Sequence, residues 1–269
     1  MKLYSNKLEG KIQDLNFPTK SLMFAELAQI AYLDPNNAEK EVRKLGFTTV
    51  EFYNKDGAQA YRFMNKHDLV IACRGTQPTQ FNDIAADLKA YPVKSDSVSR
   101  VHRGFKKEVD DLWPMIAEDI TRKVNVTKNI WFCGHSLGAA MATIMASRCW
   151  ENVDLKDPIE LYTYGSPRVG WRGFVNSLAV KHYRWKNNND IVTTVPPSFL
   201  GYKHDGELCY LNMYGNLREF TWWQRFKDKM RGIWAGIKQG KIDSFSDHSI
   251  GLYVAYLKMY ASGKENSQR

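Results

Sequence analysis

The sequence predicts an α/β protein with a mostly parallel central sheet and helices on both of its faces. From residue 69 onward, short apolar runs alternate with longer segments whose apolar residues have helical spacing. The run LVIAC at 69–73 is apolar throughout, as expected for a strand buried on both faces. The chain has 269 residues, 43% of them hydrophobic, and no linker-like stretch divides it, so we expect a single domain over residues 1–269.

The individual elements follow from local patterns. The expected strands are short apolar or alternating runs, at 48–53, 59–64, 69–73, 130–133, 159–164 and 182–186. The turn sequence NKDG joins the first two of them into a hairpin. The expected helices have apolar residues three or four positions apart, at 21–32, 101–123, 137–150, 171–180 and 248–261. Ser21 is the expected N-cap of the first helix, and Pro114 is a potential break in the second.

Small and polar residues gather where the expected strands end. Thr76, Ser136, Gly165 and Asp190 each lie at or just after the carboxyl end of a strand. In open α/β sheets, ligands bind beyond this edge. The sequence therefore predicts a site there before any motif is considered.

Ser136 lies in the motif GHSLG, residues 134–138, between an expected strand and an expected helix. This strand–turn–helix context is the one in which a G-x-S-x-G serine acts as an exposed nucleophile. The flanking glycines are needed because a side chain on either side would collide with the neighbouring strand or helix. A small residue in a tight turn is the alternative. The N–H of Leu137 would be one oxyanion donor, and Thr76, after the strand at 69–73, would supply the second.

A serine nucleophile needs a base that is held by a carboxylate, in the chain order Ser, Asp, His. Asp190 follows a strand in a polar turn, and His248 opens the last helix, so these two are the expected acid and base. His204 remains the rival base. His135 adjoins the nucleophile, but we interpret it as a structural support. This chemistry requires neither a cofactor nor a metal ion, and we expect none.

Six motifs, in order along the chain, together resemble the class 3 lipases: CRGT, HRGF, GHSLGAA, YGSPRVG, NNDIVTTVPP and DHSIGLY. The resemblance runs from about residue 21 to 260. It implies an α/β-hydrolase-like fold and hydrolysis of the carboxylic ester bonds of lipids, as by triacylglycerol lipases. The family's nucleophile, acid, base and oxyanion residue fall on Ser136, Asp190, His248 and Thr76. The family's lid would map to residues 77–99, which lack the tryptophan seen in fungal lids.

Residues 212–245 form a basic, aromatic insertion between the expected acid and base. Residues 218–241 contain seven Lys or Arg and two Asp or Glu, so +5 of the chain's net +9 lies here. Trp222, Trp223, Phe226 and Trp234 share one helical face, which is typical of a helix in a membrane interface. Plain packing on the domain is the alternative. No recognition motif accompanies the charge, so we expect no nucleic-acid partner.

Several functions stay open at this point. A phospholipase or an acyltransferase could use the same site, and a membrane-binding module could carry a vestigial triad. The N-terminal residues lack the apolar core of a secretory signal, so we expect a cytoplasmic protein that contacts membranes at most peripherally, with secretion by another route as the alternative. The four cysteines are scattered, without metal-ligand spacing, and we expect buried free thiols.

Overall fold

A computed structural model describes residues 1–75, 91–221, 223–224, 227–228 and 246–265. Thr76, most of the expected lid and the aromatic residues Trp222, Phe226 and Trp234 therefore lie outside the described residues.

The described residues build a seven-stranded main sheet with the order β1-β2-β3-β6-β7-β9-β11. Its strands are β1 (Thr49–Lys55), β2 (Ala58–Met64), β3 (Asp68–Cys73), β6 (Asn129–His135), β7 (Pro158–Tyr164), β9 (His182–Asn187) and β11 (Glu207–Leu211). All neighbours from β3 to β11 pair in parallel, whereas β1, β2 and β3 are antiparallel. The mostly parallel sheet that the sequence predicts is confirmed.

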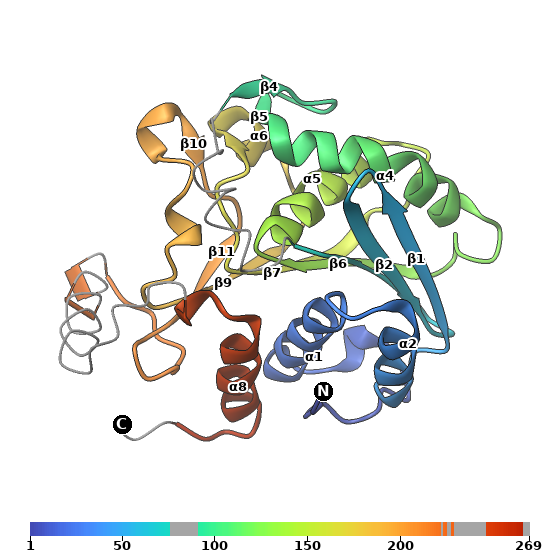
Figure 1. Ribbon diagram of the computed structural model, residues 1–269, viewed down its shortest axis with the longest axis horizontal. Coiled ribbons are helices and arrows are strands. Elements are labelled where there is room, and N and C mark those ends of the chain that lie inside the picture. Colours follow the sequence, from blue (N-terminus) through green and yellow to red (C-terminus); the bar gives the residue numbers. More distant parts are fainter. Residues whose placement is uncertain (76–90, 222, 225–226, 229–245, 266–269) are drawn as a thin grey trace.

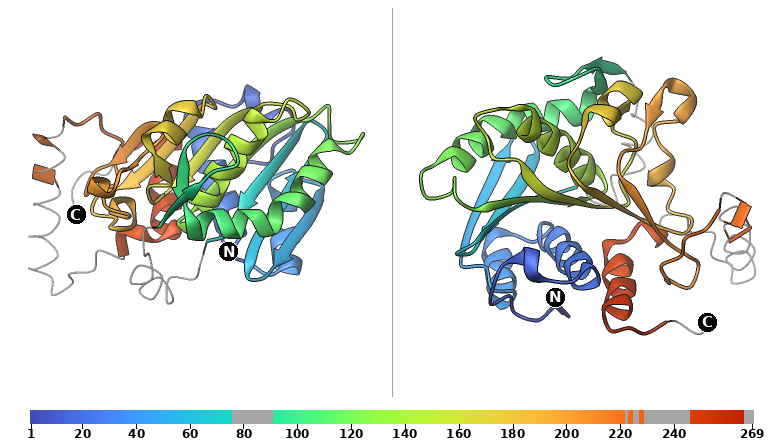
Figure 2. Two further views of the ribbon diagram at one scale, coloured as in Figure 1. Left: turned by 90° about the horizontal axis from the view of Figure 1, so that it is seen from above. Right: turned by 180° about the vertical axis from the view of Figure 1, so that it is seen from behind.

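Helices cover both faces of this sheet (Figure 1). One face carries α1 (Phe17–Ile30), α2 (Pro35–Lys44) and α8 (Ile250–Ala261), and the other carries α4 (Arg103–Thr121) and α5 (Leu137–Glu151). Each face has its own buried apolar cluster. Seen from behind, α8 lies beside the N-terminal helices although the two segments are at opposite ends of the chain (Figure 2).

The first helix begins earlier than the sequence pattern indicates. Asn16 is its N-cap, accepting a 2.9 Å hydrogen bond from the N–H of Thr19, and Pro18 occupies the first turn, where no N–H is needed. The prediction of Ser21 as the cap is wrong: it lies inside the helix and donates its hydroxyl to the carbonyl of Phe17 at 2.8 Å. Pro114 lies inside α4 without ending it.

A second, small sheet stands beside the main one, in the order β10-β8-β5-β4 within the described residues. It consists of β4 (Pro92–Lys94), β5 (Arg100–His102), β8 (Gly170–Trp171) and β10 (Tyr202–Lys203), and the short helix α6 (Arg172–Ser177) follows β8. β4 lies within residues 77–99. Short 3₁₀ helices occur at Ile12–Asp14, Val192–Thr194, Ser198–Leu200 and Ser246–His248.

Cys73, Cys133, Cys149 and Cys209, all in the described part of the chain, are buried and free, as predicted. Among the described helices, none is both long and apolar enough to cross a bilayer.

Candidate active site

Ser136 lies in a strained turn between β6 and α5. Its backbone has φ 60° and ψ −130°, a conformation that non-glycine residues rarely adopt and that costs on the order of 1–3 kcal/mol. The two flanking glycines leave no room for a side chain. A Cβ on Gly134 would lie 2.3 Å from the carbonyl oxygen of Gly138, and a Cβ on Gly138 would lie 2.3 Å from that of Cys73. The tight packing predicted for the motif is therefore present.

The surroundings of Ser136 suit the binding of a negative oxygen. Leu137 is the first residue of α5, so its N–H has no partner inside the helix, and the positive end of the helix dipole points toward the serine. A Cβ on Gly75 would lie 3.2 Å from the Cβ of Ser136. The segment that follows β3 thus passes directly beside Ser136 just before it reaches Thr76, which lies outside the described residues.

Asp190 and His248 form a buried pair beyond the ends of β9 and β7. The Nδ1 atom of His248 lies 3.0 Å from each carboxylate oxygen of Asp190. The carboxylate also accepts hydrogen bonds from the hydroxyl of Tyr253 at 2.6 Å and from the N–H of Val192 at 2.9 Å. Because a carboxylate only accepts, Nδ1 carries the imidazole proton and Nε2 keeps its lone pair.

Ser136 lies at the same sheet edge as this pair. Its N–H donates to the carbonyl of Tyr164, the last residue of β7, at 3.0 Å. The next residue, Gly165, has φ 58°, and a Cβ there would lie 2.6 Å from Oδ2 of Asp190 and 2.8 Å from Cε1 of His248. The Oγ of Ser136 is buried and hydrogen-bonds to no described residue. The residues around the serine therefore touch the acid–base pair directly.

His135 links the turn at Ser136 to His248. Its ring is stacked on that of His248, with centroids 4.4 Å apart. Its Nε2 donates to the carbonyl of His248 at 2.6 Å, so its Nδ1 accepts from the hydroxyl of Tyr32 at 2.9 Å. Burial, together with the nearby His248, holds the pKa of His135 well below its ordinary value. His135 is therefore uncharged, and it packs against the imidazole of His248.

Tyr253 and Tyr32 are neighbours of the candidate site that sequence reasoning missed. Tyr253 lies on α8 and its hydroxyl also accepts from the N–H of Asn187 at 2.9 Å, so it ties the helix to the end of β9. Burial, with a smaller effect from Asp190, raises its pKa well above the ordinary value. Its place in the apolar spacing of the last helix makes it resemble an ordinary core residue, and only the fold brings it to Asp190.

The two other downstream histidines do not contact Asp190. The Nε2 of His204 donates to the carbonyl of Thr193 at 2.8 Å, and burial followed by the charge of Arg184 lowers the pKa of His204 to about 2. His182 lies between Thr163 and Asp205, with 2.7 Å to each. Both rings are occupied by structural contacts, so neither competes with His248.

Comparisons with known proteins find similarity to lipases. The family model for lipase (class 3) matches residues 70–200. A secreted mono- and diacylglycerol lipase 1 of Fusarium solani is 38% identical over 42% of this chain and 34% of its own length. The secreted mono- and diacylglycerol lipase MDL2 of Malassezia globosa is 29% identical over 74% of this chain and 72% of its own. The chain spans about a third of the length of the first curated relatives it matches.

The structure of the Rhizomucor miehei triacylglyceride lipase superposes with a TM-score of 0.62, at 22% identity, over 75% of this chain and 82% of that one, which shows a shared fold.

The comparisons also correct one expectation. The prediction of a cytoplasmic protein is wrong, because the Fusarium and Malassezia relatives are secreted, which points to an extracellular location. The motif order and the family model over residues 70–200 show that the chain resembles the class 3 lipases, and the superposition shows that it shares their α/β-hydrolase-like fold.

Proposed function

We propose that this chain is a serine hydrolase that cleaves the carboxylic ester bonds of lipids through an acyl-enzyme. The observation that carries the proposal is the pairing of His248 with Asp190 beside a strained serine whose Oγ hydrogen-bonds to no described residue. The names of the Fusarium and Malassezia relatives favour mono- and diacylglycerols as substrates.

The proposed reaction begins when Oγ of Ser136 attacks the ester carbonyl carbon and Nε2 of His248 takes the serine proton. Asp190 keeps the imidazole in the required tautomer and stabilises its cation. The N–H of Leu137 and the residue Thr76 hold the oxyanion. When the tetrahedral intermediate collapses, the alcohol leaves with the proton from His248 and the acyl group stays on Ser136. A water molecule then attacks the acyl-enzyme with His248 again as base, which releases the acid and restores the serine.

An active-site label tests the proposal most directly. A fluorophosphonate should modify wild type at Ser136 and should leave Ser136→Ala unmodified. The two proteins should then be compared on p-nitrophenyl esters and on acylglycerol and phospholipid emulsions. Labelling with hydrolysis supports the proposal. No adduct on wild type would instead support a membrane-binding module with a vestigial triad, and ester products formed only with added alcohol would indicate an acyltransferase.

We also propose that the basic, aromatic insertion contacts the lipid surface through Trp222, Trp223, Phe226 and Trp234. Trp223, which belongs to the described residues, is 63% exposed, which supports an outward-facing aromatic group. Asp228 anchors the insertion to the domain by accepting from the hydroxyl of Tyr210 at 2.8 Å. Trp223→Ala should weaken sedimentation with anionic vesicles while hydrolysis of a short, soluble ester is retained. Equal sedimentation of the two proteins would contradict this role of Trp223.

A further inference from the structure

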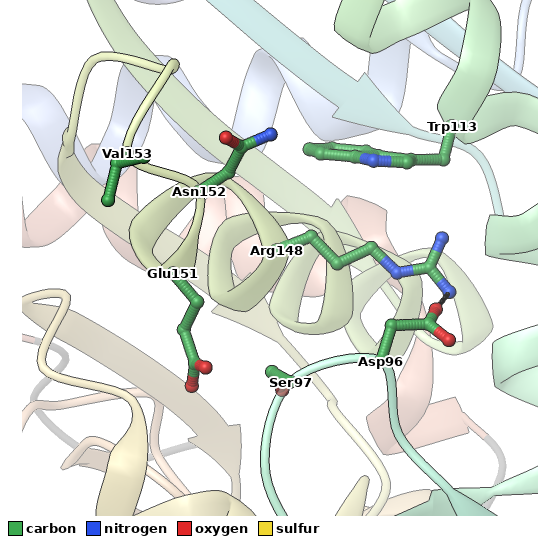
Figure 3. Close-up of a pocket in the computed structure, with 7 residues that line it drawn as sticks. All are labelled: Asp96, Ser97, Trp113, Arg148, Glu151, Asn152 and Val153. Carbon is green, nitrogen blue, oxygen red and sulfur yellow. Dashed lines mark ion pairs between the residues drawn. The ribbon is translucent and has the colours of Figure 1, made fainter.

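A cavity lies far from the candidate active site, between α4, the end of α5 and the loop that joins β4 to β5 (Figure 3). Its volume is about 410 Å³. Its polar and aromatic lining consists of Asp96, Ser97, Trp113, Arg148, Glu151 and Asn152. Ser136 stands at the start of α5 and this cavity at its end, roughly 20 Å away along a 15-residue helix. The cavity is therefore independent of the proposed ester hydrolysis.

A hydrogen bond and several ion pairs hold the residues that line this cavity in place. The hydroxyl of Ser97 lies 3.0 Å from that of Ser147, which ties the loop to α5. Asp96 pairs with Lys106 at 3.0 Å and also with Arg148, which in turn pairs with Asp110 on α4. Preformed walls are what a small-molecule site needs, because little order has to be gained on binding.

Arg148 leaves an unused donor at the cavity. Its side chain is only 8% exposed, and its Nε is buried without a hydrogen-bond partner among the described residues. In Figure 3 the side chain crosses the middle of the cavity, with Trp113 on one side and Asp96 and Ser97 on the other. A buried N–H without a partner is unfavourable, and a ligand with an acceptor oxygen would satisfy it.

We propose that this cavity binds a saccharide unit. The carboxylates of Asp96 and Glu151 accept hydrogen bonds, Arg148 donates them, and the amide of Asn152 does both. Sugar hydroxyls also donate and accept, so they match such a mixed wall. The apolar C–H face of a pyranose ring can pack against an aromatic surface, and the half-buried indole of Trp113, with Arg148 over one face of its ring, belongs to the lining.

Charged ligands fit the same lining less well. The charges of Asp96 and Arg148 are already used in ion pairs with each other, with Lys106 and with Asp110, so an anion would face the carboxylate of Glu151 and a cation would face a guanidinium. A volume of about 410 Å³ lies within the usual range of ligand pockets. It leaves room for a neutral monosaccharide or disaccharide.

Saturation-transfer NMR on the intact protein tests this site with glucose, galactose, mannose and N-acetylglucosamine as probes. We expect transfer to at least one of them, and Trp113→Ala and Asn152→Ala should each weaken its affinity by about tenfold or more. The matched control is Trp150→Ala, because Trp150 lies on α5 between the lining residues Arg148 and Glu151, is 37% exposed and does not line the cavity. Circular dichroism would confirm that all three variants fold.

Two results would overturn the assignment. One is the absence of transfer to every sugar, and the other is sugar binding that Trp113→Ala and Asn152→Ala leave unchanged. Choline and inorganic phosphate serve as charged competitors, and loss of the sugar signal on addition of either one at low concentration would assign the cavity to an ionic ligand in place of a saccharide. None of these results bears on ester hydrolysis, so the two proposals fail separately.

Discussion

The hydroxyl of Tyr253 donates a 2.6 Å hydrogen bond to Asp190, the same carboxylate that holds the imidazole of His248. The carboxylate of Asp190 therefore accepts hydrogen bonds from Tyr253 and from His248, the proposed base, at the same time. Tyr253 is fully buried, so this bond has no competition from water.

Tyr253→Phe should move the acid limb of the kcat/KM profile to higher pH. With one donor removed, the carboxylate acts more strongly on the imidazole and stabilises its protonated, inactive form. Loss of a bond to a buried charged group should also lower the free energy of unfolding by about 1–3 kcal/mol. Tyr260→Phe is the control, because Tyr260 lies on the same helix and packs against the rings of Phe17 and Trp185. An unshifted acid limb in Tyr253→Phe would show that the phenol is merely structural.

Gly165→Ala should reduce kcat on the order of 100-fold or more. The new methyl group would lie 2.6 Å from Asp190 and 2.8 Å from His248, and displacements of about 1 Å in a catalytic pair have effects of this size. Gly57→Ala is the matched control. Gly57 has φ 93°, so it shares the backbone strain, but nothing lies within 4 Å of its added Cβ. Equal loss of activity in both variants would assign the effect to backbone strain and contradict the steric argument.

Replacing Ser136 should separate catalysis from stability. Both Ser136→Ala and Ser136→Gly should lose at least about 1000-fold in ester hydrolysis. Ser136→Gly should nevertheless be more stable than Ser136→Ala by about 1–2 kcal/mol, because only glycine accepts φ 60° without strain. Urea unfolding measures the difference. At Ser147, inside α5, the order should reverse, since glycine is less favourable than alanine in a helix. The same order at both sites would argue against strain at the turn.

Acid should destabilise the fold through its buried histidines. In the described chain, burial is the main cause that lowers the pKa of His102 to about 4 and of His204 to about 2, and it also lowers the pKa of His135 and His182. As the pH falls through about 6.5, these histidines become protonated in the unfolded chain but stay neutral in the folded chain. Stability should therefore decrease by about 1.4 kcal/mol per pH unit for each such histidine.

His204→Gln tests this dependence. The glutamine amide can still donate to the carbonyl of Thr193, but it does not titrate. Between roughly pH 6 and 5, the slope of the unfolding free energy against pH should therefore decrease by the amount that corresponds to about one proton. An unchanged slope in His204→Gln would contradict the effect of burial on this ring.

Much of the candidate site could be predicted from sequence because its signals are local. A strand, two glycines and a helix around Ser136 are consecutive in the chain, and the polar turn at Asp190 and the helix start at His248 are equally short patterns. Tyr32 and Tyr253 could not be predicted, because each fits the apolar spacing of an expected helix, 21–32 or 248–261, and only the fold brings it to the site. β8 and β10 have two residues each, so neighbouring strands, not their own sequence, define them.

The burial of the four cysteines makes the native protein unreactive toward thiol reagents. Burial raises the pKa of Cys149 and of Cys209 to about 12 and raises that of Cys73 and Cys133 as well, so the nucleophilic thiolate is rare even where a reagent could enter. A maleimide should therefore modify this protein only at the rate at which the whole molecule opens. Mass spectrometry of the adducts would then measure the rate of that opening.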